Sequence, residues 1–324
     1  MEYVNLGRTG LKISQYIVGC DNFGDQTEEP ASLRMLAAAA DAGVNTLDTA
    51  NSYVGGRSEE IVGKFLKGRR DEIVLATKCR SRVGDGLHDI GTSRKAIMKA
   101  IEDSLRRLKT DYIDLYQIHA FDPDTPLDEM LRTMDDLVRQ GKVRYIGCSN
   151  FSGFQLTQTL WVSDRDNLAR MASTQPRYNM LYRHPELELL PACEEFGVGV
   201  IVYSPMAGGF LTGKHSREGA VPGTRFSEEF RASNFYRGTY WHESQFEAVD
   251  RYVEICEKYD VSPYQLGTKW VLKHPAVTAC IVGARTEEQL QANLRDWELP
   301  VPAKALEEAQ EVADRARDSG PRLV

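Results

Sequence analysis

The stretch "YIDLYQIHAFDPDTPLDEMLRTMDDLVRQGKVRYIGCS", residues 112–149, predicts one strand–helix–strand unit. Its two ends, residues 112–119 and 143–149, are short apolar runs with the length of buried strands. Between them, Leu127 to Gln140 carries apolar side chains at i, i+3, i+4, i+7, i+10 and i+11, which gives a helix one apolar face. Gly141 is typical of the residue after a helix. This is the repeating unit from which α/β folds are built.

The same alternation of short apolar runs and helical segments continues on both sides of this unit. Eight strands are predicted, over residues 16–20, 44–48, 72–78, 112–119, 143–149, 171–175, 199–204 and 278–283. A second helical stripe runs through Ile97, Ile101, Leu105 and Leu108. Eight such units in 324 residues predict a (β/α)8 TIM barrel, forming a single domain over residues 1–324.

Three further segments surround the predicted barrel. A β-hairpin that turns at residues 8–10 precedes it, and an accessory helix over about residues 302–317 follows it. Residues 205–240 form a long irregular insertion, which is either a lid or ligand-binding loop or a disordered connection. The alternative fold is a doubly wound sheet. Its nucleotide-binding form needs G-x-G-x-x-G after the first strand, and "GCDNFG" at residues 19–24 lacks this pattern.

The composition restricts the class of partner. The formal net charge of -7 argues against nucleic-acid binding, because phosphate backbones select for clustered positive charge. No long apolar run predicts a membrane span or a signal peptide. The scattered cysteines contain no C-x-x-C pair, so we expect reduced thiols in a cytoplasmic protein; they are Cys20, Cys79, Cys148, Cys193, Cys256 and Cys280. We therefore expect a small-molecule partner.

Polar side chains stand at the ends of nearly all the predicted strands. In a (β/α)8 barrel, the carboxyl ends of the strands meet around one pocket. Asp48, Lys78 and His119 end the second, third and fourth strands. An acid at a strand end commonly only forms a turn, so one such position decides little. The titratable residues together predict a reactive site, joined by the polar residues at later strand ends: Ser149, Asn150, Gln175 and Tyr203.

These residue types suit proton donation to an oxygen. The phenol of Tyr53 has a pKa of about 10 in water, so it needs a nearby cation to stabilise its phenolate. Lys78 can be that cation, and Asp48 can compensate the buried ammonium. His119 can either orient a substrate carbonyl through a hydrogen bond or share in proton transfer. No nucleophile is evident, which points to a hydride brought by a cofactor.

Motifs along almost the whole chain resemble those of the aldo-keto reductase superfamily, in its bacterial-type branch that is similar to potassium-channel β subunits. The motifs include "LGRTGLKIS" (6–14), "GVNTLDTANSYVGGRSEEIVGKFL" (43–66), "SLRRLKTDYIDLYQIH" (104–119), "GKVRYIGCSNFS" (141–152) and "IVGARTEEQLQANL" (281–294). The resemblance implies a catalytic tetrad of Asp48, Tyr53, Lys78 and His119. It also implies that Tyr53 donates a proton while a nicotinamide hydride reduces a carbonyl.

The resemblance further implies an NADP(H) site. Ser149, Asn150 and Gln175 would contact the carboxamide, and Tyr203 would stack on the nicotinamide ring. Arg285 favours NADP(H), because a guanidinium pairs with phosphate through two hydrogen bonds. The full set of implied cofactor residues is Gly19, Ser149, Asn150, Gln175, Tyr203, Ser204, Pro205, Met206, Gly208, Leu211, Lys214, Arg225, Gly283, Arg285, Gln289 and Asn293.

Two places depart from the family pattern. Cys20 and Asp21 stand where relatives commonly have Thr or Cys followed by Met or Trp. An acid at Asp21 either binds a hydroxyl-rich or cationic substrate or caps a turn. The arginines of the insertion cannot be matched one by one, and Arg225 is the one expected to contact phosphate.

Three other functions are disfavoured. The segment from Gly208 to Lys214 fits G-x-x-x-x-G-K, but His215 follows where an NTPase needs Ser or Thr for magnesium. A metal-dependent hydrolase needs several His and acid ligands that converge on one ion, and of the six histidines only His119 lies at a predicted strand end. A regulatory subunit that binds nucleotide without turnover has no need of the tetrad. We therefore expect an NADPH-dependent reductase of an aldehyde or ketone, with its substrate set by the loops.

Overall fold

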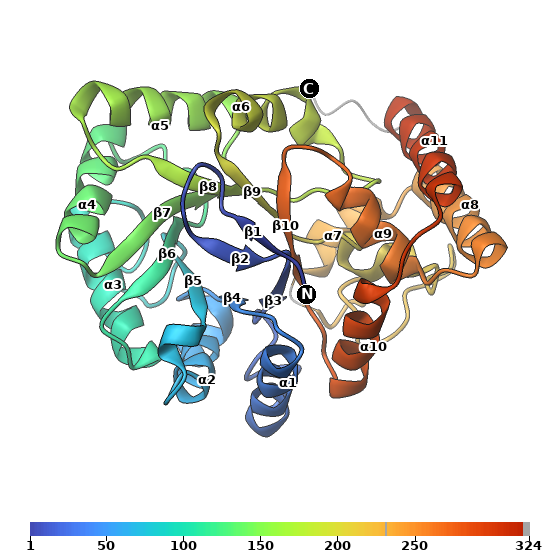
Figure 1. Cartoon of the computed structure of the whole chain (residues 1–324), viewed down its shortest axis with the longest axis horizontal. Coiled ribbons are helices and arrows are strands. Elements are labelled where there is room, and N and C mark those ends of the chain that lie inside the picture. The colour runs from blue at the N-terminus through green and yellow to red at the C-terminus, as the bar shows by residue number, and fades with distance from the viewer. Residues whose placement is uncertain (231, 320–324) are drawn as a thin grey trace. The chain divides into compact units, whose positions relative to one another are not determined.

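The computed structural model of the chain describes residues 1–230 and 232–319. Within it, eight parallel strands form a closed barrel in the order β10-β3-β4-β5-β6-β7-β8-β9 (Figure 1). The strands are β3 (Tyr16–Gly19), β4 (Thr46–Asp48), β5 (Val74–Cys79), β6 (Ile113–Ile118), β7 (Val143–Ser149), β8 (Met171–Gln175), β9 (Gly199–Val202) and β10 (Val277–Val282). The predicted (β/α)8 TIM barrel is confirmed.

Helices alternate with these strands along the chain. The first six are α1 (Glu29–Asp41), α2 (Arg57–Phe65), α3 (Arg94–Leu108), α4 (Leu127–Arg139), α5 (Gly153–Asp166) and α6 (Leu189–Phe196). Helix α4 buries Met130, Leu131, Met134 and Leu137, which are four residues of the predicted apolar face. Gly141 follows it with a φ of 72°, a left-handed conformation that glycine adopts at little cost.

A β-hairpin closes the amino end of the barrel. Its strands β1 (Tyr3–Asn5) and β2 (Lys12–Ser14) pair antiparallel, as predicted. Leu6 and Ile13 are buried in one apolar cluster with residues near the amino ends of barrel strands, including Ile17, Val74 and Leu115. The barrel interior is therefore filled with apolar side chains at this end, and its polar residues must lie towards the other.

Several strands are shorter than the sequence predicts, and for β4 and β9 the backbone shows the reason. Residues 44 and 45 were expected to open the second barrel strand, but Gly43 has a φ of 87° and Val44 N–H donates to Ala39 O of α1. These two residues still belong to the turn after α1. At the end of β9, Ser204 has a φ of 54°, which no strand residue adopts, so the strand stops before Tyr203.

The insertion at residues 205–240 is more regular than the sequence predicts. It contains the 3-10 helix η4 (Ala207–Thr212) and helix α7 (Ser233–Tyr240). The ring of Phe210 lies 5.1 Å from Phe226 and 5.0 Å from Phe246, measured between centroids. Such spacing is typical of packed aromatic pairs, so these contacts account for the order of the segment. One of the arginines of the insertion, Arg231, lies outside the described residues.

The chain divides into two compact units. The first comprises residues 1–176, 185–203 and 276–294 and contains the whole barrel. The second comprises residues 177–184, 204–275 and those from 295 onward, and it contains α7, α8 (Glu243–Tyr259), α9 (Pro263–Leu272) and α11 (Ala303–Ser319). Helix α11 confirms the predicted accessory helix, and α10 spans Glu287–Glu298. The expectation of one domain over residues 1–324 stays a prediction.

Two absences concern only the described residues. None of the helices found there has the length and apolar character needed to cross a lipid bilayer. Within the same part of the chain, no group of three or more His, Cys, Asp or Glu side chains is arranged to hold a metal ion.

The hairpin contact can be tested by shortening one buried side chain. We expect Ile13→Ala to lower the free energy of unfolding by about 2–5 kcal/mol, because a cavity opens in the barrel core. The matched control is Leu187→Ala, which shortens a side chain that is 57% exposed; we expect it to change stability by less than about 0.5 kcal/mol. Urea unfolding followed by circular dichroism measures both, and equal effects would contradict the assignment of the hairpin to the core.

Candidate active site

The polar interior of the barrel lies at the carboxyl ends of its strands. In β5, Val74 and Ala76 belong to the apolar core cluster, and Lys78 follows on the same inward face, since strand side chains alternate between faces. In β6 the same step leads from Leu115 to Gln117. Asp48 is the last residue of β4, so that it meets Lys78 and Gln117 at one level of the barrel.

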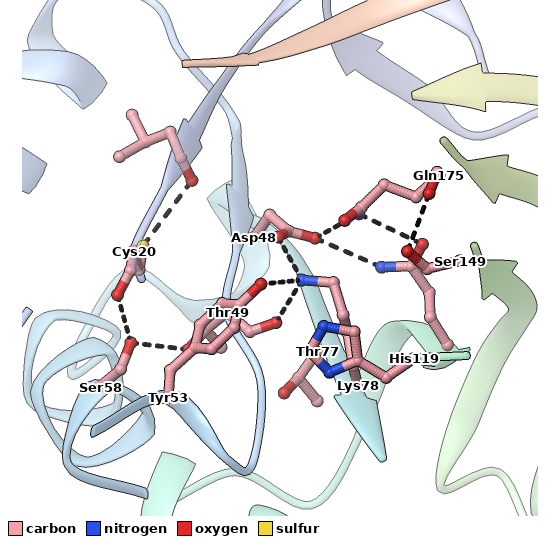
Figure 2. Close-up of polar contacts among 12 residues, drawn as sticks. Cys20, Asp48, Thr49, Tyr53, Ser58, Thr77, Lys78, His119, Ser149 and Gln175 are labelled. Carbon is pink, nitrogen blue, oxygen red and sulfur yellow. Dashed lines mark hydrogen bonds and ion pairs between the residues drawn. The ribbon is translucent and has the colours of Figure 1, made fainter. Parts of the chain in front are cut away.

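Lys78 is the centre of this polar group (Figure 2). Its ammonium has no exposed surface and forms a hydrogen-bonded ion pair with Oδ1 of Asp48. The same Nζ donates to Thr49 O at 2.9 Å and lies 3.1 Å from Tyr53 Oη. An ammonium has three N–H donors, and the three contacts with Asp48, Thr49 and Tyr53 account for all of them.

The second oxygen of Asp48 is also occupied. Gln175 Nε2 donates to Oδ2 at 2.8 Å, and Gln117 Nε2 lies 3.3 Å from the same oxygen. The carboxylate is thus held from β5, β6 and β8 together. Both amides keep Asp48 aligned on Lys78, because hydrogen bonds from fixed partners restrict its rotation.

Charge pairing decides the protonation of Lys78. Burial alone would lower the pKa of its ammonium, but the negative charge of Asp48, assisted by Tyr53, raises that pKa above its usual range. Lys78 therefore stays a cation at every physiological pH.

Tyr53 is held as a protonated phenol. Burial raises the pKa of Tyr53 to about 12, against the opposing effect of the Lys78 charge, while the charges of Asp48 and Asp21 raise it further. The sequence led us to expect that Lys78 stabilises the phenolate. It does act in that direction, but loss of hydration is the larger effect, so the resting group is a proton donor.

The turn that carries Tyr53 is tightly folded. Tyr53 opens the 3-10 helix η1 (Tyr53–Gly56), in which Val54 has a φ of 49° and Gly56 a φ of 94°. Just beyond it, the buried Glu59 of α2 accepts hydrogen bonds from Thr77 Oγ1 of β5 at 2.6 Å and from Arg107 Nε of α3 at 2.7 Å. The hydrogen bond from Thr77 ties the helix after the Tyr53 turn to the strand that carries Lys78, and the ion pair with Arg107 ties it to α3.

His119 follows β6 and faces Tyr53. Their rings meet edge to face with centroids 5.7 Å apart, and His119 Nδ1 lies 3.2 Å from Ser81 Oγ. Burial, with the positive charges of Lys78 and Arg80, lowers the pKa of His119 to about 3. The imidazole is therefore neutral above that pH. When Ser81 donates to Nδ1, the ring proton is on Nε2, which can then donate to a substrate oxygen.

The cofactor residues predicted on the barrel form two groups. Beside the tetrad, Asn150 Nδ2 donates to His119 O and Ser149 Oγ, both at 3.0 Å, while Tyr203 Oη donates to Asn150 Oδ1 at 2.8 Å. Ser149 Oγ donates to Gln175 O at 2.8 Å. Gly19 ends β3, where an added Cβ would meet Ile281 at 2.7 Å, so only glycine fits without a shift.

The second group surrounds the start of α10. Gly283 follows β10, and the backbone N–H of Arg285 donates to Gln289 Oε1 at 2.9 Å. Thr27 Oγ1 donates to Arg285 O at 3.0 Å, which fixes the turn against the loop after β3. Asn293 lies one helical turn beyond Gln289.

The remaining predicted residues, from Ser204 to Arg225, lie in the second unit and form a network of their own. Asn179 Nδ2 donates to Ser204 O at 2.9 Å. The Tyr236 hydroxyl accepts a hydrogen bond from Arg225 Nη1 at 2.7 Å, and its ring lies where a Cβ on Gly208 would stand. In the same unit lie Pro205, Met206, Leu211 and Lys214. The cofactor roles assigned to both units stay predictions.

Sequence reasoning missed two side chains of this site. Gln117 was read only as part of the apolar run 112–119, although a buried amide two positions before His119 shares its face of the strand. That alternation was a usable signal. Ser81 lies in a loop, and nothing in its surroundings along the chain indicates a contact with His119.

A comparison with known protein families identifies the family of the chain. A family model described as the aldo/keto reductase family matches residues 16–314. The chain belongs to the aldo/keto reductase family.

Several aldo/keto reductase relatives align over nearly their whole length. An uncharacterized oxidoreductase, YrpG, of Bacillus subtilis is 38% identical over 94% of both chains. A probable voltage-gated potassium channel subunit beta of Arabidopsis thaliana is 36% identical, with 91% of this chain and 90% of the relative covered. A versiconal hemiacetal acetate reductase of Aspergillus parasiticus is 34% identical over 90% of each. Two of these three relatives are thus named as an oxidoreductase or a reductase, and one as a channel subunit.

The neutral state of His119 has a consequence for acid stability. The unfolded chain protonates this histidine near its ordinary pKa of about 6.5, whereas the folded protein does so only near 3. Unfolding therefore takes up a proton between these values, and stability is lost as pH falls through that window. We expect His119→Asn, which cannot titrate, to lose less of its free energy of unfolding than the wild type between pH 7 and pH 4.

The control for this prediction is His184→Asn, at an exposed histidine. Urea unfolding across the pH range compares the three proteins. A gap between the His119→Asn and wild-type curves that does not change with pH would show that His119 is not held neutral.

Proposed function

We propose that this aldo/keto reductase reduces an aldehyde or ketone to the alcohol with NADPH. One observation carries the proposal: the buried Lys78 ammonium contacts both the Asp48 carboxylate and the Tyr53 hydroxyl. A structural ion pair has no need of the phenol, and a phenol without the cation is a poor proton donor. Their combination suits proton transfer to an oxygen.

The donor set around the tetrad fits a nicotinamide cofactor. Ser149, Asn150 and Gln175 offer amide and hydroxyl groups that match a carboxamide, and Tyr203 offers a ring for stacking. Arg285 precedes the amino end of α10, where backbone N–H groups and the helix dipole favour a phosphate. A bound NADPH would supply the hydride for the carbonyl carbon.

The residues of this chain handle the proton. Tyr53 donates its phenolic proton to the carbonyl oxygen as negative charge develops there. Lys78, 3.1 Å away, stabilises the phenolate that remains, and Asp48 keeps the lysine in position. His119 donates a hydrogen bond from Nε2 to the same oxygen and fixes its direction, so that orientation rather than proton transfer is its role.

The proposed partner and cellular location are those expected from the sequence. A small carbonyl compound is the partner, and the cytoplasm is the location, because the six cysteines are buried and none forms a disulfide in the described structure. Burial raises the pKa of Cys79 and of Cys148 to about 12 each, so neither thiol near the site provides a nucleophile.

A second function rests on the printed names of relatives. Proteins described as potassium channel β subunits are 35–36% identical to this chain, so a regulatory subunit that binds nucleotide is the alternative. The intact contact between Lys78 and Tyr53 favours turnover. Robust oxidation of NADPH by any carbonyl would decide between the two.

Removal of the phenolic hydroxyl tests the proton donor. We expect Tyr53→Phe to lower kcat by about 10²- to 10⁴-fold, the usual contribution of a general acid, while the Kd for NADPH changes little. Turnover is followed as NADPH oxidation against a panel of aldehydes, keto-sugars and ketosteroids, with NADH in parallel. An active Phe variant would refute the assignment.

Arg285 is the test of cofactor choice. We expect Arg285→Ala to weaken NADPH binding by about 10- to 100-fold, which corresponds to the loss of a charge-assisted hydrogen bond, and to leave NADH binding almost unchanged. Fluorescence titration of both dinucleotides gives the two Kd values. Equal losses would show that Arg285 does not recognise the 2'-phosphate.

A further inference from the structure

A crevice lies beside the tetrad, between the loop after β5 and the first turns of α3. It is open to solvent, and the 300 Å³ or so of empty space at this place includes solvent outside its mouth. Its lining includes three residues near the tetrad, Asn51, Arg80 and Ser81, and three charged residues further along the chain, Asp89, Lys99 and Asp103. Two contacts connect it to the tetrad: Ser81 Oγ lies 3.2 Å from His119 Nδ1, and Asn51 N–H donates to Lys78 O at 3.1 Å.

Arg80 brings a positive charge to this crevice without a counter-charge from the described residues. Its Nε is buried and has no hydrogen-bond partner there, and its guanidinium forms no ion pair. The acids of the crevice are already engaged: Lys99 pairs with both Asp89 and Asp103. A buried donor of this kind costs free energy unless a partner arrives.

The backbone at Arg80 is also strained. Its φ of 97° lies in the region that side chains other than glycine rarely adopt. Such a conformation is unfavourable in a residue with a side chain, and it recurs at functional sites. Arg80 thus combines two unfavourable features, an unpaired guanidinium and a strained backbone, directly after the strand that carries Lys78.

Asn51 supplies a second unpaired polar group. Its side chain is 2% exposed, and its Oδ1 is buried with no hydrogen-bond partner among the described residues. The amide can turn by half a rotation, which places its N–H donors where the oxygen now lies. Arg80 and Asn51 together then offer the donor pattern that carboxylate and phosphate groups accept.

We infer that this crevice binds an anionic group of the carbonyl substrate, either a carboxylate or a phosphate. The inference rests on the proposed function, in which His119 holds the carbonyl oxygen. Ser81 lines the crevice and contacts the Nδ1 edge of His119, so the crevice adjoins the residue whose Nε2 holds the carbonyl oxygen. The preferred substrate is a short aldehyde or ketone with an acidic end.

Matched substrate pairs test the inference. The pairs are 4-oxobutanoate with butanal and glyceraldehyde 3-phosphate with glyceraldehyde; the first reports carboxylate binding and the second phosphate binding. We expect the wild type to prefer the anionic member of at least one pair, and Arg80→Met to lower that kcat/KM ratio by about 10- to 100-fold, as loss of a charged hydrogen bond would. Arg80→Lys restores part of it.

The control variant is Arg82→Met, which removes an exposed guanidinium from the same loop. We expect it to keep the ratio within about twofold of the wild type, because exposed charges are screened by solvent. A wild type that turns over neutral aldehydes without anionic preference overturns the inference and leaves the proposed function standing. No turnover of any carbonyl overturns the proposed function, and the substrate assignment with it.

Two measurements need no turnover. Calorimetric titration with butanedioate should show binding to the wild type that Arg80→Met and Asn51→Asp both lose. Arg80→Gly should lose it too, yet keep a Tm at least as high as the wild type, because glycine relieves the strained φ. Unchanged butanedioate binding in Arg80→Met, or a large fall of Tm in Arg80→Gly, would overturn the inference.

Discussion

The buried ion pair between Lys78 and Asp48 is the interaction on which the site depends. Two opposite charges inside a barrel are unfavourable unless each is fully hydrogen bonded, because both lose their hydration. Here the lysine also forms hydrogen bonds with Thr49 O and Tyr53 Oη. The aspartate also accepts hydrogen bonds from the side-chain amides of Gln117 and Gln175. Removal of any one partner therefore disturbs the positions of the others.

The arrangement follows from an uneven division of the barrel interior. The hairpin and the amino ends of the strands fill one end with apolar side chains, whereas the inward positions near the carboxyl ends are polar. Stability and chemistry are thus assigned to different ends of the same strands, as is usual for this fold. Glu59 holds the helix after the Tyr53 turn in place, because it accepts hydrogen bonds from Thr77 of β5 and from Arg107 of α3.

Much of this could be predicted from local patterns. Apolar periodicity located the strands, and the polar residues that end them included Asp48, Lys78 and His119. Other features depend on contacts between residues far apart in the chain, and no local pattern encodes them: Ser81 against His119, or the packing of Phe210 with Phe246 that orders the insertion. The sequence also could not predict that burial raises the pKa of Tyr53 more than the charge of Lys78 lowers it. That balance depends on how completely the folded structure excludes water from the phenol.

The protonation of Lys78 has one more chemical consequence. An unprotonated amine beside an aldehyde condenses with it to form an imine, which would inactivate a protein that handles carbonyl compounds. Asp48 keeps Lys78 charged, and its N–H groups are engaged with fixed oxygen atoms, so the lysine has no lone pair to attack with. The same ion pair that contacts Tyr53 thereby prevents Lys78 from reacting with any carbonyl compound that enters the barrel.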